Sequence, residues 1–305
     1  MIHELKGKYR VSLACICRLF GITRQAYYQH FQHEDELKTE QEMIIKQVVM
    51  LRENHRAMGT RKLYEVLQPF LLEHQIKIGR DALFDLLAQH KLLVKRRKRK
   101  ISTTMSYHRF HKWPNLIKGF VPLGANALYV SDITYWKIET GFVYISFITD
   151  AYSHKIVGYQ AAETLEAIES LTALKMALEP ISEEIKEKLI HHSDRGVQYC
   201  SDGYVKLLQD NHIKISMTQN GDPLENAIAE RVNGILKEEC LCHFKVSTLE
   251  EARKVLEENV KLYNNERPHM SIGNLTPSFI HETNMKTERL WKNYYQKRKE
   301  EVIKC

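Results

Sequence analysis

The spacing of apolar residues changes along the chain and divides it into a helical first third and a mixed remainder. Up to about residue 90, apolar side chains recur at helical intervals within residues 13–20, 43–51, 63–71 and 83–87. From residue 123, apolar runs of strand length appear at residues 127–136, 142–149 and 155–160, separated by turn residues. The pattern predicts an all-α region followed by a β-rich region.

Helices and strands alternate after the three β-rich runs. We expect a helix at residues 165–178, a strand at 189–192, a helix at 202–211 and a strand at 214–218. Two long helices are expected at residues 223–241 and 248–264. Three meandering strands followed by alternating elements predict an α/β domain with a mixed five-stranded sheet flanked by helices.

The first 33 residues have the pattern of a helix-turn-helix reader of DNA. Gly21 can end the first helix in a left-handed conformation, and Thr23 can cap a second helix over residues 24–31. The second helix of such a motif enters the major groove, and its first turn here carries Arg24, Gln25 and Tyr28. A plain helical hairpin remains the alternative. Residues 34–95 resemble a second helical unit of the same kind.

Basic residues are concentrated in one segment. The chain carries 45 Lys and Arg against 38 Asp and Glu, a net charge of +7. Nine cations and no acid fall within residues 91–112, among them Arg96, Arg97, Lys98 and Arg99. We interpret residues 96–122 as a basic linker that follows DNA, with a solvated charge run or a localisation signal as alternatives. The tail, residues 284–305, combines basic and aromatic residues and is typical of either a nucleic-acid contact or a docking helix.

Several classes of protein are disfavoured by the sequence. No apolar run approaches the roughly 20 residues of a membrane span. The six cysteines are sparse, so a reducing cytosol is expected rather than a disulfide framework. The Cys240-Leu-Cys242-His243 stretch is a weak candidate for a metal site, and helix-end cysteines are the simpler interpretation.

Three acids of the α/β region are candidates for chemistry. Asp132 lies in an apolar strand, where a carboxylate is costly unless it is paired or binds a metal. Asp194 follows a short apolar strand, and Glu230 lies in a helix. On a helical wheel Glu230 shares one side with Asn226, Asn233 and Lys237, a combination suited to metal and phosphate. For each acid taken alone, a structural or solvated role is the favoured interpretation. Asp150, at the end of the second strand, is a competing candidate for the first acid.

The three acids and their flanking residues resemble a known family. Asp194 and Glu230 are separated by 35 residues. The motifs around them are Ser193-Asp194-Arg-Gly196-Val-Gln198-Tyr and Glu225-Asn226-Ala-Ile-Ala-Glu230. Three further motifs follow: Lys237-Glu-Glu239, Tyr263-Asn-Asn-Glu-Arg267-Pro268-His269 and Leu275-Thr-Pro277. This order resembles the second-frame, retroviral-integrase-like DDE transposases of the "IS three" group of bacterial insertion sequences. Glu225 stands where relatives often have Asp, and Arg231-Val232 replaces a usual Ser-Phe.

The resemblance implies an RNase H-like catalytic core at residues 123–283, preceded by the all-α helix-turn-helix region. It implies Asp132, Asp194 and Glu230 as catalytic residues. Three hard carboxylates select Mg²⁺ or Mn²⁺, here as two ions. Lys237 would hold DNA phosphate, with Asn226 and Arg195 as weaker candidates. His191 and His192 have counterparts in relatives without zinc catalysis, which favours a supporting role.

The implied partners are double-stranded DNA, as element ends and target, and further copies of the chain in at least a dimer. The sequence leaves open whether the chain acts with an upstream-frame protein or as a fusion, as relatives commonly do, or acts alone, which its own N-terminal reader favours. The expected setting is cytoplasmic and nucleoid-associated. Two other functions stay open. One is a non-catalytic repressor derived from a transposase, and the other is an RNase H-type nuclease.

Overall fold

The structure is a computed structural model that describes residues 12–94, 109–219 and 226–288. The chain divides into two compact units. One is formed by Met1–Glu53 and Leu67–Leu93, and the other by Asn54–Val66 and Val94–Cys305. The segment that contains Arg96, Arg97, Lys98 and Arg99 lies outside the described residues, as does residue 289 onward.

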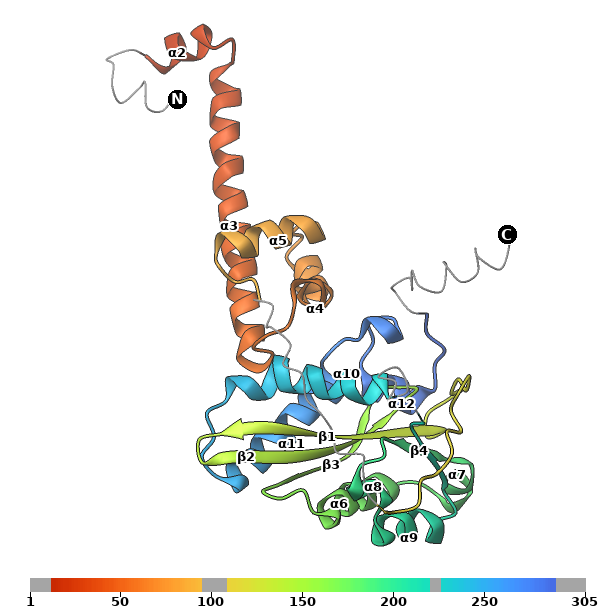
Figure 1. Ribbon diagram of the computed structural model, residues 1–305. Coiled ribbons are helices and arrows are strands. Elements are labelled where there is room, and N and C mark those ends of the chain that lie inside the picture. Colours follow the sequence, from red (N-terminus) through yellow and green to blue (C-terminus); the bar gives the residue numbers. More distant parts are fainter. Residues whose placement is uncertain (1–11, 95–108, 220–225, 289–305) are drawn as a thin grey trace, which may run out of the picture. The chain divides into compact units, whose positions relative to one another are not determined.

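The first unit is helical, and its first two helices are joined by a turn at the predicted place (Figure 1). Helix α2 (Leu13–Leu19) ends at a turn in which Gly21 has a φ of 69°, and the Ile22 N–H donates to the Cys17 carbonyl. The Thr23 hydroxyl then accepts the Ala26 N–H at 3.0 Å and caps helix α3 (Arg24–Asn54).

Helix α3 is much longer than the expected helix of residues 24–31. It continues to Asn54 because no Gly or Pro occurs between Arg24 and Asn54 to interrupt it. The predicted boundary between residues 33 and 34 therefore falls inside a continuous helix. Helices α4 (Thr60–Glu73) and α5 (Arg80–Gln89) follow, and the expected apolar stripes of α3, α4 and α5 supply the buried side chains of this unit, including Ile44, Val48, Leu67, Leu71, Leu83 and Leu87.

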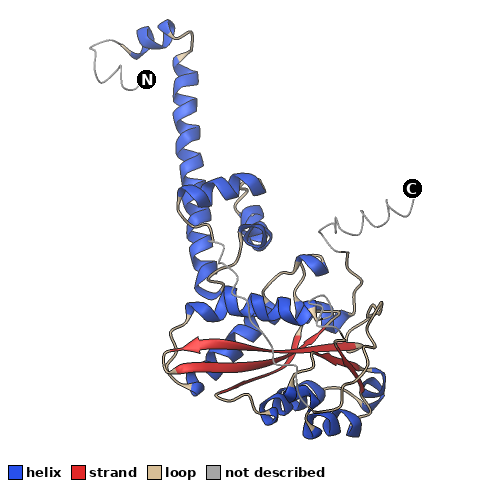
Figure 2. Ribbon diagram, viewed as in Figure 1, coloured by secondary structure: helices blue, strands red, loops and turns tan. Residues whose placement is uncertain are grey.

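The second unit contains the predicted mixed sheet of five strands (Figure 2). The strands lie in the order β3-β2-β1-β4-β5. The first three form an antiparallel meander, and β4 and β5 run parallel to β1. Their bounds are β1 (Leu128–Ile138), β2 (Gly141–Asp150), β3 (Ile156–Ala162), β4 (Ile190–Ser193) and β5 (Lys214–Met217).

Helices cover both faces of this sheet, as expected for an α/β core. One face packs against α6 (Ala167–Leu178), α8 (Val197–Cys200) and α9 (Asp202–Asp210). The other packs against α10 (Ala227–Ile235) and α11 (Leu249–Asn265). Short elements complete the unit: α7 (Glu183–Lys188), a π-helix (Leu236–Cys240), two 3₁₀ turns (Leu241–His243 and Met270–Ile272) and α12 (Pro277–Thr283).

The contact between α6 and β3 is very close. A Cβ added to Gly158 of β3 would lie 2.1 Å from the Ala173 carbonyl oxygen of α6. Only a residue without a side chain allows this helix to pack at that distance, so the glycine sets the spacing between helix and sheet. None of the helices in the described ranges is long and apolar enough to cross a membrane.

Candidate active site

The parallel register of β1 and β4 places two of the predicted acids side by side. Ser131 of β1 pairs with Ser193 of β4. Asp132 directly follows Ser131 in the chain, and Asp194 directly follows Ser193. Neighbouring strands in a sheet lie about 4.8 Å apart. The topology therefore brings Asp132 and Asp194 to the same point of the sheet, although 61 positions separate them in the chain.

Asp132 is half-buried, and both of its carboxylate oxygens are hydrogen-bonded. Its Oδ1 accepts the Ile133 N–H at 2.9 Å, and its Oδ2 accepts the side-chain amide of Asn233 at 2.8 Å. Burial, the charge of Asp194 and the charge of Glu230 together raise the pKa of Asp132 to about 7, against the lowering effect of the two donors. The other two acids thus both act electrostatically on Asp132.

Asp194 is held by the turn that follows it. Its Oδ1 accepts the Gly196 N–H at 2.9 Å, and a Cβ on Gly196 would lie 2.9 Å from the same oxygen. Glycine at this position lets the turn close on the carboxylate. Arg195, predicted as a supporting residue, is half-buried in this turn.

Helix α10 presents Glu230 between two buried amides. Asn226, just before the helix, donates its side-chain N–H to the Ser131 carbonyl at 3.0 Å, and Asn233 donates to Asp132. Glu230 itself is exposed. The helical wheel places Asn226, Glu230 and Asn233 on one side of the helix. In the structure the two amides on that side face strand β1 rather than solvent. Our site prediction missed Asn233, although the helical wheel had already placed it beside Glu230.

Lys237 lies in the π-helix that continues α10. Its ammonium nitrogen stands 3.5 Å from the ring centroid of Tyr135, a residue of β1 three positions beyond Asp132. This cation–π contact brings the predicted phosphate-binding lysine to the strand that carries the first acid. Tyr135 belongs to the same sequence motif as Asp132, but no sequence pattern indicated its contact with Lys237.

The two histidines before Asp194 belong to hydrogen-bond networks beneath the site. The Nε2 of His191 lies 2.7 Å from the Ser131 hydroxyl and 2.9 Å from the Tyr204 hydroxyl. The Nδ1 of His192 lies 2.8 Å from the Ser216 hydroxyl. Burial lowers the pKa of His191 to about 3, so its ring is neutral and joins β1 to β4 by hydrogen bonding.

Asp150, the competing first acid, has a different environment. It is fully buried and accepts the backbone N–H groups of Asn126 and Ser153, each at 2.7 Å, together with the Ser153 hydroxyl. These donors join the turn after β2 to the segment before β1. Its carboxylate oxygens are used in holding that turn.

The donor set fits a hard divalent cation in type. It combines three carboxylates with the Oδ1 atoms of Asn226 and Asn233, which are buried without a hydrogen-bond partner within the described residues. In the ranges 12–94, 109–219 and 226–288, however, no three His, Cys, Asp or Glu side chains are gathered closely enough to hold a metal ion. Cys240, Cys242 and His243 lie within these ranges and therefore form no such metal-binding group.

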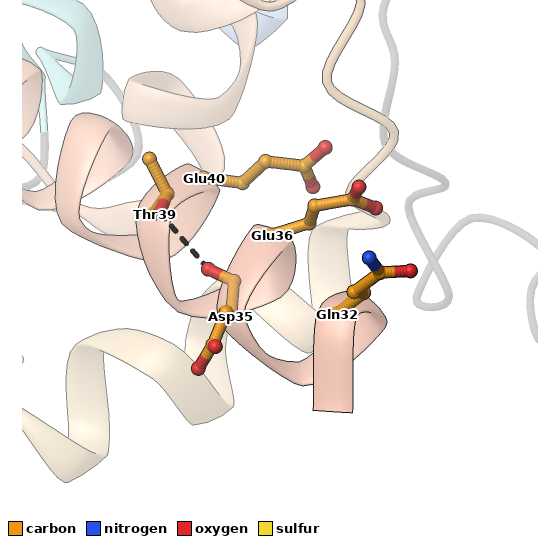
Figure 3. A pocket seen from close by; sticks show the side chains of 5 residues that line it. All are labelled: Gln32, Asp35, Glu36, Thr39 and Glu40. Carbon is orange, nitrogen blue, oxygen red and sulfur yellow. Dashed lines mark hydrogen bonds between the residues drawn. The ribbon is translucent and has the colours of Figure 1, made fainter. Parts of the chain in front are cut away.

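The predicted reader residues lie at the beginning of α3. Arg24, Gln25 and Tyr28 are all exposed in the first turns of α3. Farther along the same helix, an open hollow is lined by Gln32, Asp35, Glu36, Thr39 and Glu40 (Figure 3). Three carboxylates on this face repel phosphate, so contact with DNA is expected at the beginning of α3 and not here.

Comparisons with known proteins agree with this arrangement. Two family models, both described as "Integrase core domain", match residues 122–223 and 211–277. The first range contains Asp132 and Asp194, and the second contains Glu230. A structural likeness to the HTLV-2 integrase catalytic core domain has a TM-score of 0.42 and 18% identity, covering 52% of this chain and 98% of that domain. Such a distant likeness leaves the mechanism to the residues of this chain.

Relatives in sequence span almost the whole chain. The "Insertion element IS600 uncharacterized 31 kDa protein" of Shigella sonnei is 34% identical, covering 88% of this chain and 97% of the relative. The "Transposase for insertion sequence element IS629" of Shigella sonnei is 28% identical, with 91% and 93% covered. The "Transposase InsF for insertion sequence IS3A" of Escherichia coli K12 is 26% identical, with 92% and 97% covered. The chain belongs to the integrase-core transposases of bacterial insertion sequences, in the "IS three" group.

Proposed function

We propose that this chain binds the ends of an insertion sequence and cuts and joins DNA there, with Asp132, Asp194 and Glu230 as its catalytic residues. One observation carries the proposal. Asp132 stands on a central strand beside Asp194, and burial together with the charges of Asp194 and Glu230 raises its pKa to about 7. Such crowding of acids is costly in a protein unless a cation offsets it.

The three carboxylates would hold Mg²⁺ or Mn²⁺, two ions in the full site. When bound, these ions would activate the attacking oxygen and stabilise the leaving oxygen. The residues of the chain fix the geometry. Asn233 and the Ile133 N–H orient the Asp132 carboxylate, the Gly196 N–H orients Asp194, and Asn226 ties the start of α10 to β1.

Two displacements at phosphorus make up the reaction. Water first attacks the phosphodiester at the element's end, the bond from phosphorus to the 3′ oxygen breaks, and a free 3′-OH remains. That hydroxyl then attacks a target phosphodiester, so one phosphorus–oxygen bond forms as another breaks. Lys237 would hold a DNA phosphate close to the acids, where its ammonium already lies against β1.

A strand-transfer assay with labelled end DNA and Mg²⁺ tests the proposal. Asp132→Asn, Asp194→Asn and Glu230→Gln are each expected to lower joining by at least about 100-fold while end binding is kept. The matched control is Asp210→Asn, an exposed acid at the end of α9. Joining retained by any of the three variants would remove that acid from the set.

The same assay separates the other two functions. End binding without joining by the unmodified chain would favour a transposase-derived repressor. Cleavage of RNA–DNA hybrid in preference to duplex DNA would favour an RNase H-type nuclease. Partner copies are tested by the mass of the complex on paired ends, where a dimer or larger assembly is expected.

DNA contacts outside the core rest on the exposed first turns of α3 and on the basic linker. Replacing Arg24, Gln25 or Tyr28 by Ala is expected to weaken end binding by roughly 1–3 kcal/mol for a base-contacting side chain. Neutralising Arg96, Arg97, Lys98 and Arg99 together is expected to flatten the salt dependence of end binding. An unchanged slope would show that the linker does not contact the element's end.

A further inference from the structure

The helix that carries Glu230 does not end as an ordinary α-helix. Helix α10 passes at Leu236 into a π-helix that extends to Cys240. π-helical turns are rare, they insert one extra residue into a helix, and they are often found at functional sites. Lys237 and Glu239 both lie in this turn. The orientation of the turn therefore decides where both side chains point.

The two side chains leave the turn in nearly opposite directions. Positions two residues apart on a helix differ by roughly 200° around its axis, and by somewhat less in a π turn. Lys237 reaches the ring of Tyr135 on β1, with the ammonium 3.5 Å from the ring centroid. Glu239 points to the segment that follows α11. The turn is thus held on two opposite sides.

Glu239 is held by a bidentate ion pair. Arg267 donates from Nε to the Glu239 Oε2 at 2.9 Å and from Nη2 to Oε1 at 2.8 Å. The third arginine nitrogen, Nη1, lies 2.7 Å from the His269 Nε2, and the guanidinium lies 5.7 Å from the ring centroid of Tyr263. The Arg267 side chain is only 4% exposed, so its planar group has almost no freedom to rotate.

A second cation reaches the same carboxylate. The ammonium of Lys62 lies 3.0 Å from the Glu239 Oε1, within the compact unit that contains both residues. Arg267 and Lys62 outweigh the opposing effect of burial and lower the pKa of Glu239 to about 2. The carboxylate is therefore ionised near neutral pH, where Arg267, whose pKa is raised by the same carboxylate, is also charged.

Stability alone is a poor explanation for this cluster. A buried ion pair often contributes little to stability compared with apolar residues of the same volume, because both charges lose their hydration. A bidentate arginine–carboxylate pair, in contrast, fixes direction as well as distance. The cluster is suited to defining the rotation of the π turn.

We infer that Glu239 and Arg267 are positioning residues for Lys237: their bidentate pair fixes the π turn so that the lysine ammonium stays against Tyr135 of β1, the strand that carries Asp132. Neither residue touches the reacting atoms. The inference rests on the proposed function, in which Lys237 holds a DNA phosphate at the site.

A double-mutant cycle on strand transfer tests the inference. Arg267→Lys and Glu239→Gln are each expected to lower kcat/KM for joining by about 10-fold or more in the presence of Lys237. In a Lys237→Ala background, the same changes are expected to alter kcat/KM by less than about 2-fold. Glu257→Gln is the control, because it breaks the exposed Glu257–Lys261 pair of α11 and touches neither side of the π turn.

A second measurement does not require activity. Amine acylation followed by mass spectrometry reports how accessible Lys237 is in the full-length protein without DNA. Its rate is expected to rise several-fold in Glu239→Gln relative to the unmodified chain. Glu239→Gln keeps nearly the same shape and serves if Arg267→Lys does not fold, as judged by circular dichroism.

Losses that are equal in the two Lys237 backgrounds, or a labelling rate that does not change, would overturn the inference and leave the pair a purely structural contact. Failure of the unmodified chain to join DNA would instead refute the proposed function. In that case the labelling rates would still decide whether Glu239 positions Lys237.

Discussion

Replacing Asp132 by Asn should stabilise the metal-free protein while it abolishes joining. In the folded chain this carboxylate is half-buried beside two other acids, and its pKa is raised from the ordinary 3.8 to about 7. The unfolded chain gives up the same proton near pH 4. Between these two values the folded state retains a proton that the unfolded state has lost.

The sign and size of the effect follow from this difference. Because the unfolded state binds fewer protons, the free energy of unfolding falls as pH rises from about 4 to about 7 and then levels off. A shift of about three pKa units corresponds to a ceiling of about 4 kcal/mol, at about 1.4 kcal/mol per unit. Water at the half-buried carboxylate lowers this to roughly 1–3 kcal/mol. The isosteric amide has no such charge to bury.

The assay is urea unfolding without divalent ions, at pH 5 and at pH 8, for the unmodified chain and for Asp132→Asn. The stability of the variant relative to the unmodified chain should increase between the two pH values. Addition of Mg²⁺ at pH 8 should then stabilise the unmodified chain more than the variant, because only the former keeps all three acids. Asp210→Asn serves again as the matched control.

Two outcomes would refute this reasoning. If the difference in stability between the two proteins were the same at pH 5 and pH 8, the pKa of Asp132 would not be raised by its burial and its acidic neighbours as the structure indicates. If Mg²⁺ stabilised both proteins equally, Asp132 would have no part in holding the ion.

Three further predictions concern single contacts. Asn233→Ala removes a charge-assisted hydrogen bond to Asp132 worth roughly 1.5–3 kcal/mol. The rate of joining should therefore fall by about 10- to 100-fold, and the midpoint of its pH dependence should move upward, as a pH–rate profile would measure. The pKa of Glu239 is lowered to about 2, so its charge stabilises the folded state above about pH 4.5. As pH falls toward 2, the free energy of unfolding of the unmodified chain should drop by roughly 2 kcal/mol, whereas that of Glu239→Gln should not; acid unfolding measures both. Gly158→Ala should lower the free energy of unfolding by at least about 2 kcal/mol, because the added Cβ would clash with the Ala173 carbonyl. Gly234→Ala should raise it by roughly 0.5–1 kcal/mol, because the space around Gly234 in α10 is open. Equal effects of the two variants in chemical denaturation would contradict the packing described.

Local patterns were sufficient for most elements of the fold. The five strands and the helices α6, α9 and α11 lie within a few residues of their expected positions, because apolar periodicity reflects which side of an element is buried. The turn at Gly21 and the cap at Thr23 also follow from chemistry within a few residues. Helix α3 extends well beyond its expected end at Phe31, because neither Gly nor Pro follows that residue before Asn54.

The sequence predicted which acids form the candidate site, but it did not predict the contacts that support them. Sequence spacing and flanking motifs selected Asp132, Asp194 and Glu230, and the parallel register of β1 and β4 places the first two together. The amide that orients Asp132 comes from Asn233, 101 positions away, and the partner of Glu239 is Arg267, 28 positions away. Neither pairing follows from any local pattern.

The sequence by itself thus predicted the order of the elements and the membership of the family, and it selected the three acids as candidates, because each depends on spacing along the chain. Only the tertiary structure decided which side of α10 faces the sheet, that a π turn follows it, and which side chains orient Asp132 and Lys237. These depend on contacts between segments that packing of the sheet and helices brings together, and such contacts leave no periodic trace in the chain.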